Sequence, residues 1–152
     1  HYLRRQMEEA AALARGLSAE QAAHRYAEGK WSIKQVLGHV IDAERIFAYR
    51  LLRIGRGDAT PLPGFDENPY VDAANFDART AADLAAELEH VRQSTLDLLR
   101  HLDDGALARR GTASGFEVSA RALAWIIAGH MHHHLALIRE RYLTSPAPVP
   151  AA

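Results

Sequence analysis

The chain has 152 residues, a mass of 16.8 kDa and a formal net charge of −1, with 48% hydrophobic and 24% charged residues. These values are typical of one globular domain, and they argue against wholesale disorder and against a general attraction to nucleic acid or anionic lipid. The absence of cysteine excludes disulfides, thiolate metal sites and a cysteine nucleophile. The most apolar stretch, 123–129, is too short to span a bilayer, so we expect a soluble, cytoplasmic protein without a nucleic-acid or membrane partner.

Helical periodicity dominates the first third of the chain. Apolar residues recur at steps of four and three from Leu3, which predicts a first helix that ends near Gly16. Residues 18–21 and 32–35 both read Ser-x-x-Gln, the capping box that opens a helix. The first box predicts a short helix, and the second predicts a long helix over 33–54.

A long connection follows, over residues 55–79. It contains three glycines, three prolines and two asparagines, and it lacks the alternation of a strand. We therefore expect an irregular crossover. A connection of this length can run along a whole bundle, so the helices on either side of it can be parallel neighbours.

The second half of the chain predicts two more long helices. One extends over 80–102, and the other begins near Ser119 and ends at Tyr142 or Leu143. The connection between them is polar and could hold a strand fragment at 116–118. The sequence thus predicts an all-α protein, a four-helix bundle in one domain over residues 1–144, followed by a frayed tail over 145–152.

Four of the nine histidines lie between His130 and His134. At 100° per residue, His130 and His134 fall about 40° apart near the centre of the apolar stripe of the last helix, so both face the core. Burying an unpartnered ring costs about 1–3 kcal/mol, which a divalent metal ion bound by both rings would offset. Hydrogen-bonded core histidines are the alternative. His133 lies on the flank, where it could support such a site, and His132 points toward solvent or an interface.

The second long helix offers two further candidate ligands. Its apolar stripe is centred on a face that carries Glu44, while His39 lies on the shoulder of that face. Periodicity by itself favours Glu44, yet the small Ala43 one turn after His39 leaves room for an ion. A surface His39 and a Glu44 paired with an arginine are the alternatives, and the pattern leaves the choice open. Tyr49 and Arg50 lie off the stripe, and no role can be read for them.

Two segments resemble DinB-like proteins. Residues 30–33, KWSI, followed by 38–45, GHVIDAER, are similar to the second helix of that family. Residues 129–134, GHMHHH, followed by Ile138, are similar to its last helix. The resemblance covers nearly the whole chain, including the long connection, although the first helix looks short.

The resemblance implies a bundle in up-down-down-up order with a metal ion held by His39, His130 and His134. It thereby favours His39 over Glu44 as the third ligand. Glu44 could then sit nearby as a supporting or acid–base group, and His133 is a second candidate for a supporting role. Zinc, nickel, iron and manganese all accept imidazole, so the ligands do not choose among these divalent ions. Three histidines would leave one position open for chemistry.

Two activities are implied by the resemblance: metal-assisted hydrolysis and transfer of a low-molecular-weight thiol to an electrophile. Within the crossover, Asp66, Glu67 and Tyr70 are candidates for contact with a small-molecule substrate, although such residues more often form turns. The alternatives are a non-catalytic metal-binding or stress-response module and a helical interaction protein with core histidines. A homodimer is also possible through helix faces that bear Trp125 and His132.

Overall fold

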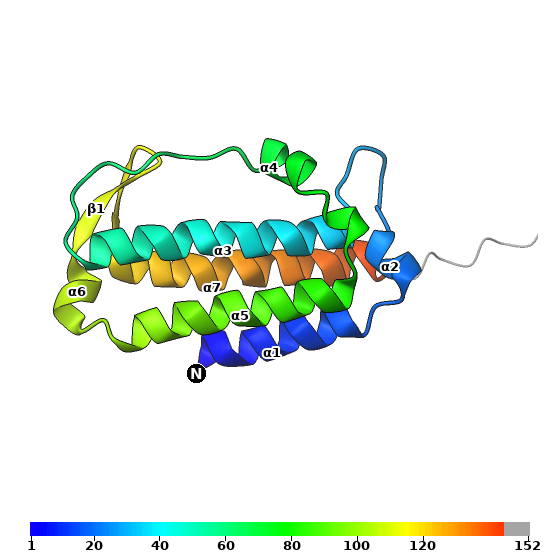
Figure 1. The fold of residues 1–152 in the computed structure, drawn as a ribbon, viewed down its shortest axis with the longest axis horizontal. Coiled ribbons are helices and arrows are strands. Elements are labelled where there is room, and N and C mark those ends of the chain that lie inside the picture. The colour runs from blue at the N-terminus through cyan, green and yellow to red at the C-terminus, as the bar shows by residue number, and fades with distance from the viewer. Residues whose placement is uncertain (145–152) are drawn as a thin grey trace, which may run out of the picture.

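Four long helices form the body of the protein in the computed structural model, which describes residues 1–144 (Figure 1). The four are α1 (Tyr2–Arg15), α3 (Ile33–Gly55), α5 (Ala81–Arg100) and α7 (Ala120–Leu137). Shorter elements join them: α2 (Ala19–Ala23), α4 (Glu67–Ala74), the 3-10 turn η1 (Phe76–Ala78), α6 (Asp104–Ala108), β1 (Arg110–Ala113), β2 (Phe116–Ser119) and the π-helical turn η2 (Ile138–Tyr142). The tail predicted to fray lies outside the described residues.

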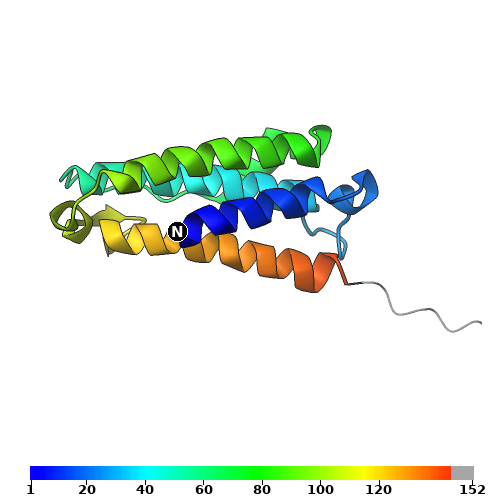
Figure 2. The same cartoon turned by 90° about the horizontal axis from the view of Figure 1, so that it is seen from below.

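The four helices run up, down, down and up. In Figures 1 and 2, α1 and α7 point one way and α3 and α5 point the other. Helix α1 packs mainly against α5, and α3 packs mainly against α7. The predicted fold class is therefore confirmed. The antiparallel packing of α3 and α7 brings the start of α3 beside the end of α7, which is where the candidate histidines lie.

Side-chain caps fix where the long helices begin. Both predicted capping boxes are formed, since the side chains of Ser18 and Ser32 each accept a hydrogen bond from the glutamine backbone three residues later. The Oγ1 atom of Thr80 caps α5, and the Oγ atom of Ser119 caps α7 at 3.1 Å. Each cap supplies an acceptor to an N–H group that has no partner within its helix.

The crossover is more ordered than the sequence predicts, because it contains α4 and η1. Asp66 caps α4 by accepting from the backbone N–H of Asn68 at 3.1 Å, and Pro69 falls in the first turn, where its missing N–H is tolerated. Asn75 then ends α4 in the left-handed conformation, with φ of 51°. The turn-forming residues therefore act as helix caps.

Phe76 anchors the crossover to α3 beside the candidate site. Its ring is buried and lies so close to Gly38 that an added Cβ there would be 2.4 Å from ring carbons. At the other end, Leu62 pairs with Ala113 of the β1–β2 hairpin. The crossover is thus held over the α3–α7 face at two points. The strand predicted near 116–118 is present as β2. None of the helices within residues 1–144 is both long and apolar enough to cross a membrane.

Candidate metal centre

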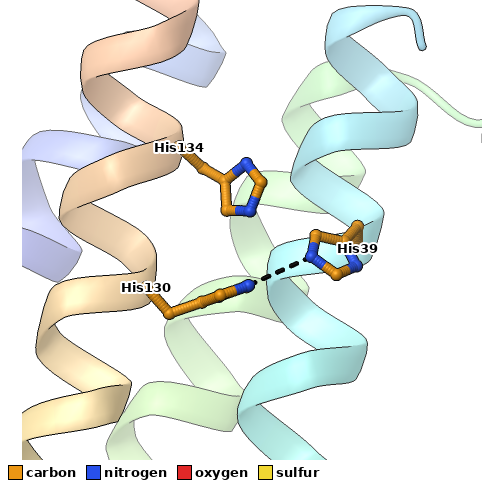
Figure 3. Close-up of side chains that lie close together, drawn as sticks. All are labelled: His39, His130 and His134. Atoms are coloured by element: carbon orange, nitrogen blue, oxygen red, sulfur yellow. Dashed lines mark hydrogen bonds between the residues drawn. The ribbon is translucent and has the colours of Figure 1, made fainter. Parts of the chain in front are cut away.

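The structure brings His39 of α3 together with His130 and His134 of α7. One ring nitrogen from each residue lies within 4.8 Å of the others. The Nε2 atoms of His39 and His130 are 3.0 Å apart, and the three ring centroids are 4.6–4.9 Å from one another. Figure 3 shows the three rings facing a common point from two helices.

This arrangement fits a bound divalent ion. Nitrogens that share one tetrahedral zinc ion at about 2.0–2.1 Å lie about 3.3 Å apart, which is close to the 3.0 Å between His39 and His130 and within the 4.8 Å that contains all three nitrogens. Within residues 1–144, Nδ1 of His134 is the one buried side-chain nitrogen or oxygen without a hydrogen-bond partner. No carboxylate or backbone carbonyl in the described part of the chain bonds to any of the three rings. The cluster is therefore not satisfied by the protein alone.

Burial keeps the three rings uncharged. Desolvation is the main cause that lowers the pKa of His130 to about 4, and the charges of His39 and His133 contribute to this shift. Desolvation likewise lowers the pKa of His134 to about 3, with added contributions from the neighbouring histidines. Burial also lowers the pKa of His39, an effect that the charge of Glu67 partly offsets. Neutral imidazole is the form that binds metals.

Aromatic side chains enclose the cluster. The Trp31 ring lies 5.0 Å from that of His39, and the Phe47 ring lies 5.4 Å from that of His130. The hydroxyl of Tyr142 donates to the backbone carbonyl of Trp31 at 2.7 Å, which ties the end of α7 to the start of α3. These walls restrict solvent and strengthen electrostatic interactions at the centre.

Glu44 does not face the histidines as a free acid. Both of its oxygens accept hydrogen bonds from Arg92, at 2.7 and 2.9 Å, and Arg92 is fully buried. This is the arginine pairing that periodicity left open. The reason is that Arg92 projects from α5 into the core and needs a counter-charge there.

The two other histidines of the 130–134 segment are exposed. The His133 ring lies 5.1 Å from that of His134, so it borders the cluster as the sequence predicts, while His132 faces solvent. A supporting role for His133 stays a prediction.

The three crossover candidates have different surroundings. The Asp66 side chain is used as the cap of α4, and the half-exposed ring of Tyr70 packs 5.4 Å from that of Phe65. Glu67 is exposed on the first turn of α4, and its charge acts on His39. Of these three residues, Glu67 is therefore the one whose charge affects the pKa of a histidine in the cluster.

A cavity of about 250 Å³ opens beside His134. Its lining is mainly aromatic and aliphatic, with one amide and one amine: Tyr26, Gly29, Lys30, Trp31, Val36, Asn68, His134, Leu137 and Tyr142. A cavity of this size accommodates a small molecule or one end of a larger one.

Comparison with known proteins identifies the family. Residues 2–138 match the DinB superfamily. The chain belongs to this superfamily. The chain is also similar to the Putative metal-dependent hydrolase OB0413 of Oceanobacillus iheyensis, which is 26% identical over 127 residues that cover 81% of this chain and 71% of that protein.

A solved DinB-like structure has the same fold. The protein YfiT from Bacillus subtilis superimposes with a TM-score of 0.77 and 21% identity, covering 91% of this chain and 82% of that one. It is described as a probable metal-dependent hydrolase with an unusual four-helix bundle topology. This likeness supports the four-helix fold, and the match of residues 2–138 to the DinB superfamily confirms the predicted family.

Two residues near the centre, Phe47 and Arg50, could not be assigned a role from the sequence pattern. Phe47 belongs to the apolar stripe of α3, but nothing in the pattern indicates that its ring meets His130. Arg50 lies off that stripe and yet is only 7% exposed. Its burial depends on the crossover that covers it, so helical periodicity could not have revealed it.

Proposed function

We propose that this chain is a metal-dependent enzyme in which His39, His130 and His134 hold one divalent transition-metal ion. The observation that carries the proposal is the convergence of three uncharged imidazoles from two helices, one with a buried nitrogen that lacks a partner. The likeness to the Putative metal-dependent hydrolase of O. iheyensis and to YfiT, described as a probable metal-dependent hydrolase, supports the same chemistry.

The chemistry that such an ion supplies is Lewis-acid activation of water or a thiol and polarisation of a substrate carbonyl. The chain's own residues would do the rest. Trp31 and Leu137 give the cavity apolar walls, and Asn68 can orient a polar substrate group by hydrogen bonding. Glu67, the acid whose charge acts on His39, would accept the proton released when the nucleophile forms.

Hydrolysis is the reaction that we favour, because both of these similar proteins are described as metal-dependent hydrolases. Transfer of a low-molecular-weight thiol is the second candidate. The observation in its favour is that Glu44, the one buried carboxylate in residues 1–144, is committed to Arg92. A thiol ionises more readily than water and needs less help from a base. Because the chain has no cysteine, that thiol would come from a substrate.

Metal loading followed by activity screening tests the proposal. Protein loaded separately with zinc, nickel, iron and manganese is assayed on esters and amides, and on small thiols with electrophilic acceptors. We expect about one ion per chain and turnover in one assay class, both lost in His134→Ala. The matched control is His132→Ala, which removes an exposed imidazole two residues away. A bound ion without turnover would indicate a non-catalytic module, and no bound ion would contradict the proposal.

A further inference from the structure

Arg50 is a buried cation without an acidic partner. Arg50 is only 7% exposed, and no carboxylate in residues 1–144 lies within salt-bridge distance of it. Its Nη2 atom donates to the backbone carbonyl of Pro63 at 2.8 Å and to Oγ of Ser114 at 3.0 Å. Both acceptors are neutral. Arg92, the other buried arginine of the described chain, has Glu44 as its counter-charge.

Two of the three guanidinium nitrogens of Arg50 are free to bind a ligand. Its Nε and Nη1 atoms make no hydrogen bond within the described part of the chain. Since His134 Nδ1 is the one buried side-chain polar atom there without a partner, these two nitrogens of Arg50 must reach solvent. The N–H groups of Nε and Nη1 lie on different edges of the guanidinium, so each can donate a charge-assisted hydrogen bond to an oxygen of a carboxylate or phosphate.

The same guanidinium lies close to the candidate metal centre. Arg50 follows His39 by eleven residues, which places both on nearly the same face of α3, about 20° apart. The Phe47 ring separates them: its centroid is 5.4 Å from that of His130 and 5.9 Å from Cζ of Arg50. On the other side, Cζ lies 6.0 Å from the centroid of Phe65 in the crossover. One aromatic ring thus stands between the cation and the histidines.

We propose that Arg50 binds an anionic group of the substrate, a carboxylate or phosphate, while the reacting end of that substrate lies at the three histidines. This inference rests on the proposed function. A buried cation attracts an anion more strongly than an exposed cation does, because the surroundings screen the charges less. Burying a cation without a counter-charge costs free energy, and binding an anionic ligand offsets that cost. Phe47 and Phe65 would pack against the apolar part that joins the anionic group to the reacting end. Burial lowers the pKa of Arg50, as expected for a cation with incomplete compensation.

The probe is a series of hydroxamates that end in a carboxylate, with chains from succinic to suberic monohydroxamate, and their carboxamide-ended counterparts. The hydroxamate end binds the ion of the zinc-loaded protein, and calorimetry measures the affinity of each compound. At one chain length or more, we expect the carboxylate to bind at least about tenfold more tightly than the carboxamide. Phosphonate-ended compounds of the same lengths distinguish phosphate from carboxylate as the preferred group.

Variants separate recognition from a structural role. Arg50→Gln should abolish the preference, and Arg50→Lys, which keeps the charge, should retain part of it. Ser114→Ala weakens the contact between Arg50 and the hairpin but leaves the charge, so the preference should survive. Arg56→Gln removes an exposed arginine just beyond α3 and controls for general attraction. If Arg50 only fastens the crossover, Arg50→Gln and Ser114→Ala will lower the melting temperature and neither will alter the preference.

The remaining outcomes are also decisive. No carboxylate preference at any length, or a preference that persists in Arg50→Gln, would overturn the role of Arg50 and leave the metal centre standing. If uncharged hydroxamates fail to bind, the proposed function fails. Arg50 is then tested with the metal-free protein, whose affinity for inorganic phosphate must fall at least about tenfold in Arg50→Gln. An unchanged affinity would overturn the inference.

Discussion

Two polar clusters lie inside the same bundle, and they differ in how far they satisfy themselves. Arg92 of α5 donates to both oxygens of Glu44, to the carbonyl of Leu3 and to Oε1 of Gln6, and its Nη2 lies 3.3 Å from Sδ of Met131. One side chain therefore contacts all three other long helices. The histidine cluster has one nitrogen–nitrogen contact and a buried nitrogen without a partner.

The difference separates a structural cluster from a ligand site. A buried charge that is paired and hydrogen-bonded needs nothing more, and removing one partner leaves the other uncompensated. Uncharged imidazoles without acceptors lose hydrogen bonds to water on burial and recover them only from a ligand. The contrast predicts that changes at Arg92 act on folding, whereas changes at the histidines act on metal binding.

The largest expected effect is at Arg92. Arg92→Met leaves the Glu44 carboxylate buried without a counter-charge. The free energy of unfolding, measured by urea titration, should fall by about 3–5 kcal/mol. The matched control is Arg15→Met, which breaks an exposed pair with Glu89 between α1 and α5 and should cost about 0–1 kcal/mol. Equal losses in the two variants would contradict the contrast.

The next effect concerns stabilisation by metal. Zinc at about a thousandfold its dissociation constant should raise the free energy of unfolding of the native protein by about 4 kcal/mol. His134→Leu should lose this increment but remain as stable as the native protein without metal, because the replaced Nδ1 had no partner. His132→Leu should keep the increase in the free energy of unfolding that zinc provides. A metal-free His134→Leu protein that unfolds easily would show that the ring is a structural core histidine.

Packing beside His39 gives an intermediate effect. In Gly38→Ala the new methyl group meets the Phe76 ring at 2.4 Å, so Phe76 and the crossover must shift, at a cost of about 1–3 kcal/mol. Gly129→Ala, at an exposed position of α7 with no atom within 4 Å, should instead stabilise by about 0.5–1 kcal/mol. Denaturant titration checks both. Opposite signs are expected, and a stabilised Gly38→Ala would contradict the close packing.

The last prediction concerns the pH dependence of the stability of the metal-free protein. An unfolded histidine titrates near pH 6.5, whereas the pKa values of His130 and His134 in the folded protein are about 4 and 3. Below pH 6.5 the unfolded chain therefore binds more protons, and stability should fall as the pH drops toward 4. The difference between native protein and His134→Leu in urea titrations from pH 7 to pH 5 isolates this contribution. Parallel curves would contradict the lowered pKa values.

The helices and their caps could be predicted from the sequence because their signals are local. The capping boxes at Ser18 and Ser32 and the cap at Thr80 depend on residues three positions apart. The stripe position of His130 and His134 follows from helical geometry in the same way. That His39 meets them depends on the antiparallel packing of α3 against α7, which only the family resemblance implied.

The remaining features depend on contacts that are distant in sequence. The crossover looked irregular, because Asp66 and Asn75 carry turn chemistry that serves equally to cap a helix. Glu44 pairs with Arg92, which is 48 residues away on α5. The apolar stripe of α5 defines only roughly which way each side chain of that helix points. Arg50 is buried by Pro63 and the hairpin residue Ser114, and neither has a periodic relation to it.

X-ray absorption at the zinc edge of the zinc-loaded protein tests the metal centre most directly. The proposed centre predicts one ion per chain, with three imidazole nitrogens and one further nitrogen or oxygen ligand at about 2.0 Å, and the loss of one imidazole in His39→Ala. A spectrum that His39→Ala leaves unchanged, or zinc that dialysis removes completely from the native protein, would contradict it.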